Sequence, residues 1–307
     1  MRGRTVFCTL LFLFFVVVLS AQTTQEGFAH VSGADLYYKK IGSGEPVVIL
    51  HGGPGLEHTY FLPQFQQLAK HYTLIFYDQR ASGKSSGVVD TTTMLAEQFV
   101  EDLEGLRKVL KLEKMNLFGH SWGGLLAMEY AFTYPRHVKS LILSNSVGAN
   151  SEWLLPYIQT RTARTTHEDS LAFARITTSK EFAQKEPKAV EEFARTIFRT
   201  YFYNRAFADS LRLTFTQQTA SNVLDIFGLF LKQYQQYDIR TALSSLSFPT
   251  LIISCDYDVM LPRFEEEIHR AIKQSKYVLL KNSGHFPFIE SPEQFFGECD
   301  HFLKSNQ

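Results

Sequence analysis

The sequence has few cysteines, three in 307 residues, at Cys8, Cys255 and Cys299. It contains no Cys-x-x-Cys pair and no His/Cys cluster with the spacing of zinc ligands, so no structural metal is predicted. Cys255 and Cys299 could form one disulfide in an exported protein, but each also fits as a small buried apolar residue. A chain of this length can bury a full core without a cross-link.

An excess of charge of either sign is also lacking, because Lys+Arg and Asp+Glu both number 31. There is no basic stripe interleaved with aromatic residues, so nucleic acid is not an expected partner. The balanced charge does not attract an anionic membrane either. With 45% hydrophobic and 20% charged residues, the composition is typical of a folded globular protein rather than a disordered or fibrous one.

The longest apolar run is too short for a membrane span. Arg2 and Arg4 precede residues 6–19, which are apolar apart from Thr9 and lead into SAQTTQEG. A spanning helix needs about 20 apolar residues. We therefore predict a cleaved signal peptide over residues 1–21, with the cleavage site uncertain by one residue and an uncleaved anchor as the alternative. The mature protein would be exported, periplasmic or secreted, without stable membrane insertion.

Short apolar runs of strand length alternate with helical patterns along most of the chain. This alternation indicates βα units and a mostly parallel sheet. Apolar residues of 94–110 recur on one face of a helix, and residues 28–44 predict an antiparallel hairpin ahead of the sheet. The strand-like runs are residues 46–53, 72–80, 115–120, 140–145, 249–255 and 277–285.

One region interrupts this alternation. Between about residues 148 and 246 no strand-like run occurs, and the composition turns to helical segments rich in aromatic residues, Arg and Gln. Because strands precede and follow it, we expect a helical insertion that lies over the strand ends. The predicted organisation is a signal peptide at 1–21, an α/β core at 22–148 and 246–307, and a helical cap at 149–245.

The stretch GHSWG, residues 119–123, places Ser121 between two glycines where a predicted strand ends and a helix begins. Glycines two residues away on each side let the strand and helix backbones approach closely. Such an elbow exposes a serine hydroxyl at the sheet edge, where it suits a nucleophile. Gly-x-Ser-x-Gly also occurs in ordinary turns, so the assignment depends on the rest of the chain.

Two later loops supply the partners that a serine nucleophile needs. His285 follows the last strand-like run, and Asp256 and Asp258 follow the run before it. Serine requires a base within hydrogen-bond reach and an acid that orients the base. The chain order Ser, Asp, His is that of α/β-hydrolases. We predict Ser121, Asp258 and His285 as the triad, because Asp258 lies far enough beyond the strand for its loop to turn toward the histidine loop. Asp256, which lies nearer the strand end, is the alternative acid.

The segment HGGPGLEH, residues 51–58, follows the first strand-like run. Its consecutive glycines leave backbone N–H groups unobstructed, which suits an oxyanion hole. We predict the Gly53 amide as one donor, with Gly52 as second choice, and the amide of Trp122 as the other donor. His51 and His120 are expected to hydrogen-bond around the site rather than to react.

The segment YDQRASGKSSG, residues 77–87, resembles a phosphate-binding loop only in part. Gly83 is followed by Lys84 and Ser85, but Asp78 stands where the first glycine of a P-loop would be. No nucleotide cofactor is therefore predicted. We expect Asp78 and Arg80 to form a buried ion pair that holds this loop.

Together these motifs resemble the prolyl aminopeptidase (proline iminopeptidase) group of α/β-hydrolases, which includes the tricorn-interacting aminopeptidases. The resemblance covers about residues 28–148 and 246–304. It implies an α/β-hydrolase fold, a mostly parallel eight-stranded sheet flanked by helices with a helical cap after strand 6. It also implies a serine hydrolase without a cofactor that releases N-terminal proline or other small residues from short peptides through an acyl-enzyme. The motifs are residues 51–55, 78–80 with Gly83 and Ser85, 119–123, Asp258 and 284–285.

The chain departs from the pattern of this group at three positions. Ala81 stands where glycine is usual, and Val259 where several members have glutamate. A cap glutamate commonly binds the free amino group of the substrate, and its nearest match is Asp225, which is one carbon shorter. Asp225 is therefore a predicted substrate-binding residue, and Gly52 of the oxyanion loop is the other. Without a cap carboxylate the same triad would cleave esters or amides, so a carboxylesterase or amidase and a non-catalytic binding protein are the alternatives.

Overall fold

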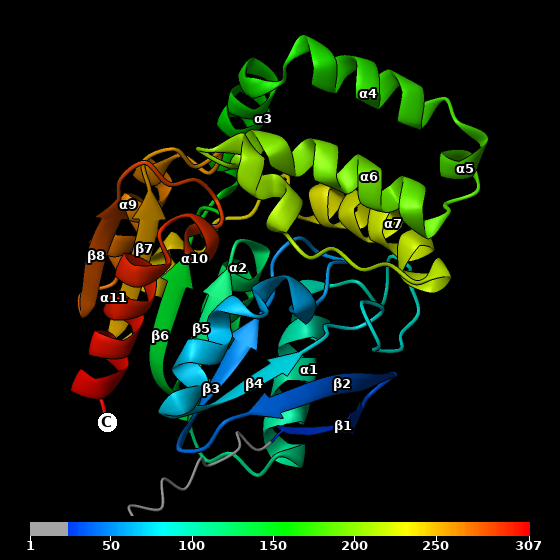
Figure 1. Ribbon diagram of the computed structural model, residues 1–307. Helices are drawn as coiled ribbons and strands as arrows, with labels where there is room; N and C mark the ends of the chain where they lie inside the picture. Colours follow the sequence, from blue (N-terminus) through cyan, green and yellow to red (C-terminus); the bar gives the residue numbers. More distant parts are fainter. Residues whose placement is uncertain (1–23) are drawn as a thin grey trace, which may run out of the picture.

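A computed structural model describes residues 24–307 (Figure 1), so the predicted signal peptide lies outside the described residues. A sheet of eight strands has the order β1-β2-β4-β3-β5-β6-β7-β8. The β1–β2 and β2–β4 pairs are antiparallel, and the other neighbours are parallel. The strands are β1 (Thr24–Val31), β2 (Ala34–Ile41), β3 (Glu45–Leu50), β4 (Tyr72–Tyr77), β5 (Met115–His120), β6 (Val138–Ser144), β7 (Thr250–Cys255) and β8 (Ser275–Leu280).

The strand predictions are confirmed. The six strand-like runs correspond to β3 to β8, and the predicted hairpin is formed by β1 and β2, which pair from Thr24–Ile41 to Val31–Ala34. All residues of β5 and β7 are buried, as expected for central parallel strands covered on both faces. Most predicted runs extend beyond the strand's end, because the residues that follow turn away as loops and carry the polar side chains of the site.

Helices cover both faces of this sheet (Figure 1). On one face α1 packs on α2, α2 on α8, and α8 on α9; on the other, η2 packs on α10 and α11. These elements are η1 (His58–Phe61), η2 (Gln64–Lys70), α1 (Ala96–Val109), α2 (Trp122–Thr133), η3 (Pro135–His137), α8 (Arg240–Leu243), α9 (Pro262–Ala271), α10 (Pro287–Glu290) and α11 (Pro292–Ser305).

Between β6 and β7 the regular elements of residues 145–249 are helical, apart from an isolated bridge between Asn150 and Asp238. Most of them lie above the carboxyl ends of the parallel strands (Figure 1). Phe230 and Tyr234 pack edge-on against the core residue Trp122, with ring centroids 4.8 and 5.4 Å away. The elements are η4 (Ser151–Trp153), α3 (Leu154–Arg164), α4 (His167–Thr177), α5 (Lys180–Ala183), α6 (Pro187–Phe198), η5 (Arg199–Tyr201), η6 (Arg205–Ser210) and α7 (Gln217–Gln233).

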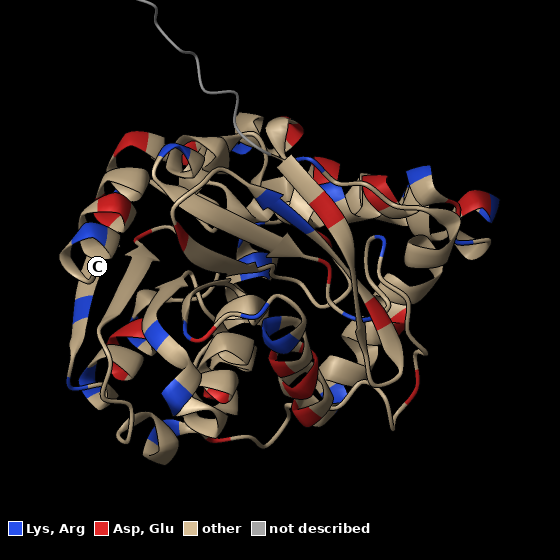
Figure 2. Cartoon of the chain, turned by 90° about the horizontal axis from the view of Figure 1, so that it is seen from below, with Lys and Arg blue, Asp and Glu red and all other residues tan. Residues whose placement is uncertain are grey.

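The structure shows how the charged residues are distributed and in which state the two cysteines are. Basic and acidic residues are interspersed over the elements seen from below (Figure 2). Cys255 and Cys299 are both buried free thiols, so the alternative of a disulfide between them is wrong. Among residues 24–307, no helix has both the length and the apolar character that crossing a membrane requires.

Glu129 on α2 is buried, and the hydroxyl of Tyr234, which follows α7, donates to its carboxyl group, 3.0 Å from each oxygen. Burial raises the pKa of Glu129 to about 8. Above the ordinary pKa of glutamate, the Glu129 carboxyl group releases its proton in the unfolded chain but keeps it in the folded chain. The free energy of unfolding therefore falls as the pH rises toward 8. We expect Glu129 to lower the free energy of unfolding by up to about 4 kcal/mol between pH 5 and 8.

Urea unfolding at pH 5 and pH 8 tests this expectation. Glu129→Gln should flatten the pH dependence, because an amide does not ionise. The matched control is Glu101→Gln, which also removes a carboxyl group bonded to a tyrosine hydroxyl, that of Tyr134, but at the exposed surface. The control should unfold with the pH dependence of the unmodified protein. An unchanged slope in Glu129→Gln would contradict the assignment.

Candidate active site

Ser121 occupies a sharp elbow between β5 and α2. Its backbone has φ 57° and ψ −122°, a conformation that costs a residue with a side chain on the order of 1–3 kcal/mol. The elbow closes because two glycines flank it. A Cβ on Gly119 would lie 2.7 Å from the carbonyl carbon of Gly123, and one on Gly123 would lie 2.7 Å from the His51 oxygen. The predicted nucleophile thus stands on a strained turn that only these glycines permit.

Asp258 and His285 meet at the same edge of the sheet. The Nδ1 of His285 lies 2.9 and 3.1 Å from the two carboxylate oxygens of Asp258. Asp258 also accepts hydrogen bonds from the Asn145 side chain at 2.7 Å and the Met260 amide at 3.0 Å. Both members of the pair are almost fully buried. This leaves Nε2 as the nitrogen of His285 that is free to act on a substrate.

The alternative acid, Asp256, lies elsewhere. Its carboxylate is 32% exposed and stands 3.9 Å from the Lys281 amine. It forms no hydrogen bond to His285 among the described residues. Asp258 is therefore the aspartate that the fold brings to the histidine. The reason is the expected one, because the loop after β7 turns toward His285 only beyond Asp256 and Tyr257.

His120 connects the serine elbow to the histidine loop. Burial lowers the pKa of His120 well below its usual range, so the ring is neutral. Its Nε2–H donates to the carbonyl oxygen of His285 at 2.8 Å, and its Nδ1 accepts from the Tyr60 hydroxyl at 2.9 Å. Tyr60 carries no sequence signal that marks it as a site residue. The sequence does not predict the role of Tyr60, because no pattern near residue 60 indicates that its hydroxyl bonds to His120.

The two glycines of the oxyanion loop have different roles. The Gly52 amide donates to the Tyr60 hydroxyl at 2.6 Å, so its predicted second-choice role as an oxyanion donor is wrong. Gly52 instead lets the loop approach the elbow, since a Cβ there would lie 2.8 Å from the Cβ of Ser121. Within residues 24–307, the amides of Gly53 and Trp122 donate no hydrogen bond to another group. They are the two donors left for an oxyanion.

Residues 45–292 match the protein family described as alpha/beta hydrolase fold. The chain belongs to the α/β-hydrolase fold family. It is 31% identical over 300 residues to a proline iminopeptidase of Heyndrickxia coagulans, an alignment that covers 91% of this chain and 99% of that protein. A proline iminopeptidase of Saccharolobus solfataricus is 28% identical over 299 residues, covering 91% and 92%. The protein is therefore a hydrolase, and its resemblance to the proline iminopeptidase group is confirmed.

Solved structures share this fold. The crystal structure of VinJ superposes with a TM-score of 0.71 at 21% identity, covering 92% of this chain and 99% of that chain. The proline iminopeptidase of Mycobacterium smegmatis superposes with a TM-score of 0.68 at 20% identity, covering 92% and 98%. The predicted eight-stranded α/β-hydrolase architecture is thus confirmed.

The hydrolase does not contain the predicted ion pair between Asp78 and Arg80. Arg80 instead pairs with Asp102 of α1, with Nε to Oδ2 at 2.7 Å and Nη2 to Oδ1 at 2.5 Å. Both side chains are buried, and burial raises the pKa of Asp102 although Arg80 opposes the rise. Asp78 faces His58 and the Lys84 amide, whereas Arg80 faces α1, so the two side chains reach different partners.

Gln79, between them, ties the hydrolase's loops together. Its amide nitrogen donates to the His51 carbonyl at 2.8 Å, its backbone N–H donates to the His51 ring at 3.0 Å, and its side-chain oxygen accepts from the Trp122 indole at 2.7 Å. One glutamine therefore links the oxyanion loop to the residue after the elbow serine. Because Trp122 also packs on α7, truncating its ring would affect more than the backbone amide.

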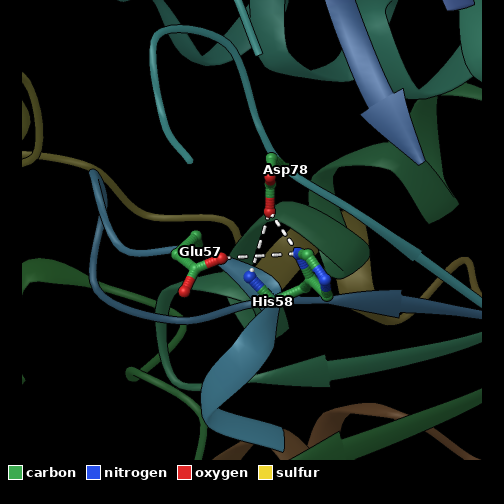
Figure 3. A group of neighbouring side chains, drawn as sticks. All are labelled: Glu57, His58 and Asp78. Atoms are coloured by element: carbon green, nitrogen blue, oxygen red, sulfur yellow. Dashed lines mark hydrogen bonds and ion pairs between the residues drawn. The ribbon is translucent and has the colours of Figure 1, made fainter. Parts of the chain in front are cut away.

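Asp78 belongs to a cluster with Glu57 and His58, whose ligand atoms lie within 4.8 Å of one another (Figure 3). One Asp78 oxygen accepts from the His58 amide at 3.0 Å and faces its ring nitrogen at 2.7 Å, and the other accepts from the Lys84 amide at 2.9 Å. Burial alone would raise the pKa of Asp78, but its bonds to His58 hold it below the ordinary value. A cation would have to break these bonds, so the cluster fits an anchor between residues 51–58 and 78–84 better than a metal site.

The predicted substrate-binding residue Asp225 is not placed for that role. Its carboxylate is 59% exposed and pairs with the amine of Lys185 at 3.0 Å. Asn222, one turn earlier on α7, is buried, and its side chain donates to the Ala81 carbonyl at 3.0 Å. A carboxylate that is solvated and already paired offers little to a buried ammonium group. The sequence position alone could not show which face of α7 carries it.

The helical segment between β6 and β7 helps to hold the histidine loop. The backbone N–H of His285 donates to the Tyr201 carbonyl at 2.8 Å. Glu290 accepts from the amides of Gly284 at 2.7 Å and Asn204 at 2.8 Å. Arg164 donates to the carbonyl of Asp258 at 3.2 Å. These contacts place the acid and the base of the site partly under the control of the helical segment.

Proposed function

We propose that this hydrolase is an aminopeptidase that releases proline or another small residue from the N-terminus of short peptides. The observation that carries the proposal is the buried Asp258–His285 pair next to the strained elbow of Ser121. The relatives named proline iminopeptidase, which align over nine-tenths of the chain, support the choice of substrate.

The proposed reaction uses Ser121, His285 and Asp258 as a triad. His285 Nε2 takes the hydroxyl proton as Ser121 Oγ attacks the carbonyl carbon, and Asp258 holds the imidazole tautomer and stabilises the imidazolium. The Gly53 and Trp122 amides stabilise the oxyanion. The imidazolium then gives its proton to the leaving amine, and a water activated by His285 hydrolyses the acyl-enzyme.

An aminopeptidase must also bind the ammonium group of its substrate. We assign this role to Glu57 rather than Asp225. Glu57 follows the oxyanion loop, its side chain is only 12% exposed, and it forms no ion pair with Lys or Arg among residues 24–307. It lines a small recess with Leu56, Tyr60 and residues 212–215, which include Arg212. Burial raises the pKa of Glu57, and a substrate ammonium would stabilise the charged form.

The alternative is a carboxylesterase or amidase of the same mechanism. The observation that favours it is the pairing of Asp225 with Lys185, which leaves the helical segment without the expected carboxylate. An ester has no ammonium to bind, so this enzyme would need only the triad and the oxyanion hole.

A rate assay on residues 22–307 separates the two functions. The substrates are prolyl- and alanyl-naphthylamide, their N-acetylated forms, and a short nitrophenyl ester. We expect cleavage of the free-amine amides only, and a higher KM for them in Glu57→Gln. Fast ester cleavage with indifference to the acetyl group would instead establish the general hydrolase. Asp225→Asn, which removes an exposed carboxylate paired with lysine, is the matched control and should keep the normal KM.

We also propose that the protein is exported. Arg2 and Arg4 followed by the apolar residues 6–19 support this location. N-terminal sequencing of the protein recovered from the periplasm or medium should begin at Ala21 or Gln22. Recovery of the intact chain in the membrane fraction would favour the uncleaved anchor.

A further inference from the structure

Glu265, on α9, is fully buried beside the aspartate of the site, yet the proposed reaction does not use it. Its Oε1 accepts a hydrogen bond from the Ser146 amide at 2.8 Å. Its Oε2 has no hydrogen-bond partner within the described residues, and neither do the hydroxyls of Ser254 and Tyr277. Burial raises the pKa of Glu265 and of Tyr277. The helix α9 packs on β7 and β8, the strands that carry Ser254 and Tyr277.

Ser146 lies in a short segment that touches two residues of the site. On one side of it, Asn145 donates its side-chain N–H to Asp258 at 2.7 Å. On the other, the Val147 amide donates to the Ser121 carbonyl at 3.3 Å. Asn145 has φ 49°, a left-handed backbone that asparagine adopts more readily than most residues. The Glu265 carboxyl group holds the next residue, Ser146, through its amide.

We propose that Glu265 is a positioning residue, a neutral carboxylic acid that holds Ser146 and thereby orients Asp258 and Ser121 through residues 145–147. The inference rests on the proposed roles of Ser121 and Asp258. A neutral acid can accept from Ser146 through Oε1 while its own proton is donated from Oε2 to Ser254, which satisfies two buried atoms at once.

The ionised form fits this environment poorly. A second negative charge would lie near Asp258, with one oxygen unpaired in a site closed to water. The titratable groups that face Glu265 are Asp258 from the β7 loop, Cys255 from β7 and Tyr277 from β8. None of them offers a positive charge. Burial and the charge of Asp258 together raise the pKa of Glu265 well above its usual range.

Two variants separate positioning from bulk structure. Glu265→Gln keeps an acceptor for Ser146 and a donor for Ser254, so kcat per active site, counted with a fluorophosphonate, should stay within about twofold of normal. Glu265→Leu keeps the volume but removes the acceptor, so kcat should fall by about tenfold or more with little change in KM. The matched control is Glu266→Leu, a half-exposed neighbour on the same helix, which should keep kcat.

An infrared difference spectrum between the unmodified protein and Glu265→Gln at neutral pH provides a readout that does not depend on activity. We expect the band of a protonated carboxyl group. Its absence, full kcat in Glu265→Leu, or a loss in Glu265→Gln as large as in Glu265→Leu would each overturn the inference. If Glu265→Leu does not fold, the glutamine variant and the spectrum decide. If Ser121 is not labelled by the fluorophosphonate, the proposed function fails, while the spectrum still tests the neutral acid.

Discussion

Replacing Ser121 by alanine is expected to abolish turnover, with kcat falling by about 10⁴-fold or more. The reason is that no other group at the elbow can form the acyl-enzyme, whereas the orienting pair and the oxyanion donors remain. The fold should persist, because the Ser121 hydroxyl forms no hydrogen bond within residues 24–307 and the β-carbon that packs on Gly52 is retained.

Steady-state rates on prolyl-naphthylamide, circular dichroism and thermal unfolding check this result together. The matched control is Ser170→Ala, which removes an exposed hydroxyl on α4 that bonds only to the Thr166 carbonyl. It should leave both rate and unfolding temperature unchanged. A fluorophosphonate should label the unmodified protein at Ser121 and leave Ser121→Ala unlabelled. A Ser121→Ala protein with near-normal rates would show that the nucleophile lies elsewhere.

Replacing Gly123 by alanine is expected to damage both stability and activity. The new Cβ would lie 2.7 Å from the His51 oxygen and would also meet the Leu50 carbonyl, and real Cβ atoms do not approach backbone atoms so closely. Neither side can yield easily, because β3 is a central strand paired on both edges. We expect a loss of about 3 kcal/mol in the free energy of unfolding. We also expect a fall of about 10²-fold in kcat, since His51 begins the loop that carries Gly53.

Urea unfolding and rate measurements on Gly123→Ala test this expectation. The matched control is Gly297→Ala on α11, where a Cβ would meet nothing within 4 Å. Alanine there should raise the stability by about 1 kcal/mol, because glycine is the poorer helix former. Normal stability in Gly123→Ala would mean that the elbow can open at little cost, which would contradict the close approach as the reason for the motif.

Much of the site was predictable because its signals are local. The glycines that the elbow needs all lie within five residues of chain, at 119–123. The loops that carry Asp258 and His285 follow short apolar runs bounded by turn residues, which are typical of buried strands. Parallel strands bring their carboxyl ends to one edge of the sheet. The residues therefore had to gather there once the strands were recognised.

The errors concern partners rather than elements. Arg80 bonds to Asp102 instead of Asp78, the Gly52 amide bonds to Tyr60, and Asp225 bonds to Lys185. In each case the sequence offers several candidate partners of the same chemical kind. Which of them forms the bond depends on the distances between elements in the folded protein.

The fold class, the order of the strands along the chain and the position of the elbow serine follow from local patterns, because hydrophobic period and glycine spacing act within a few residues. Which carboxylates are buried, which are solvated and which backbone amides are left free depends instead on how distant elements pack. Glu57, Asp225 and Glu265 look alike as carboxylates in the sequence. The packing of distant elements makes one a mostly buried acid without a Lys or Arg partner, one a surface ion pair and one a fully buried group behind the site. Burial and pairing, which no local pattern encodes, set the charge that each can carry.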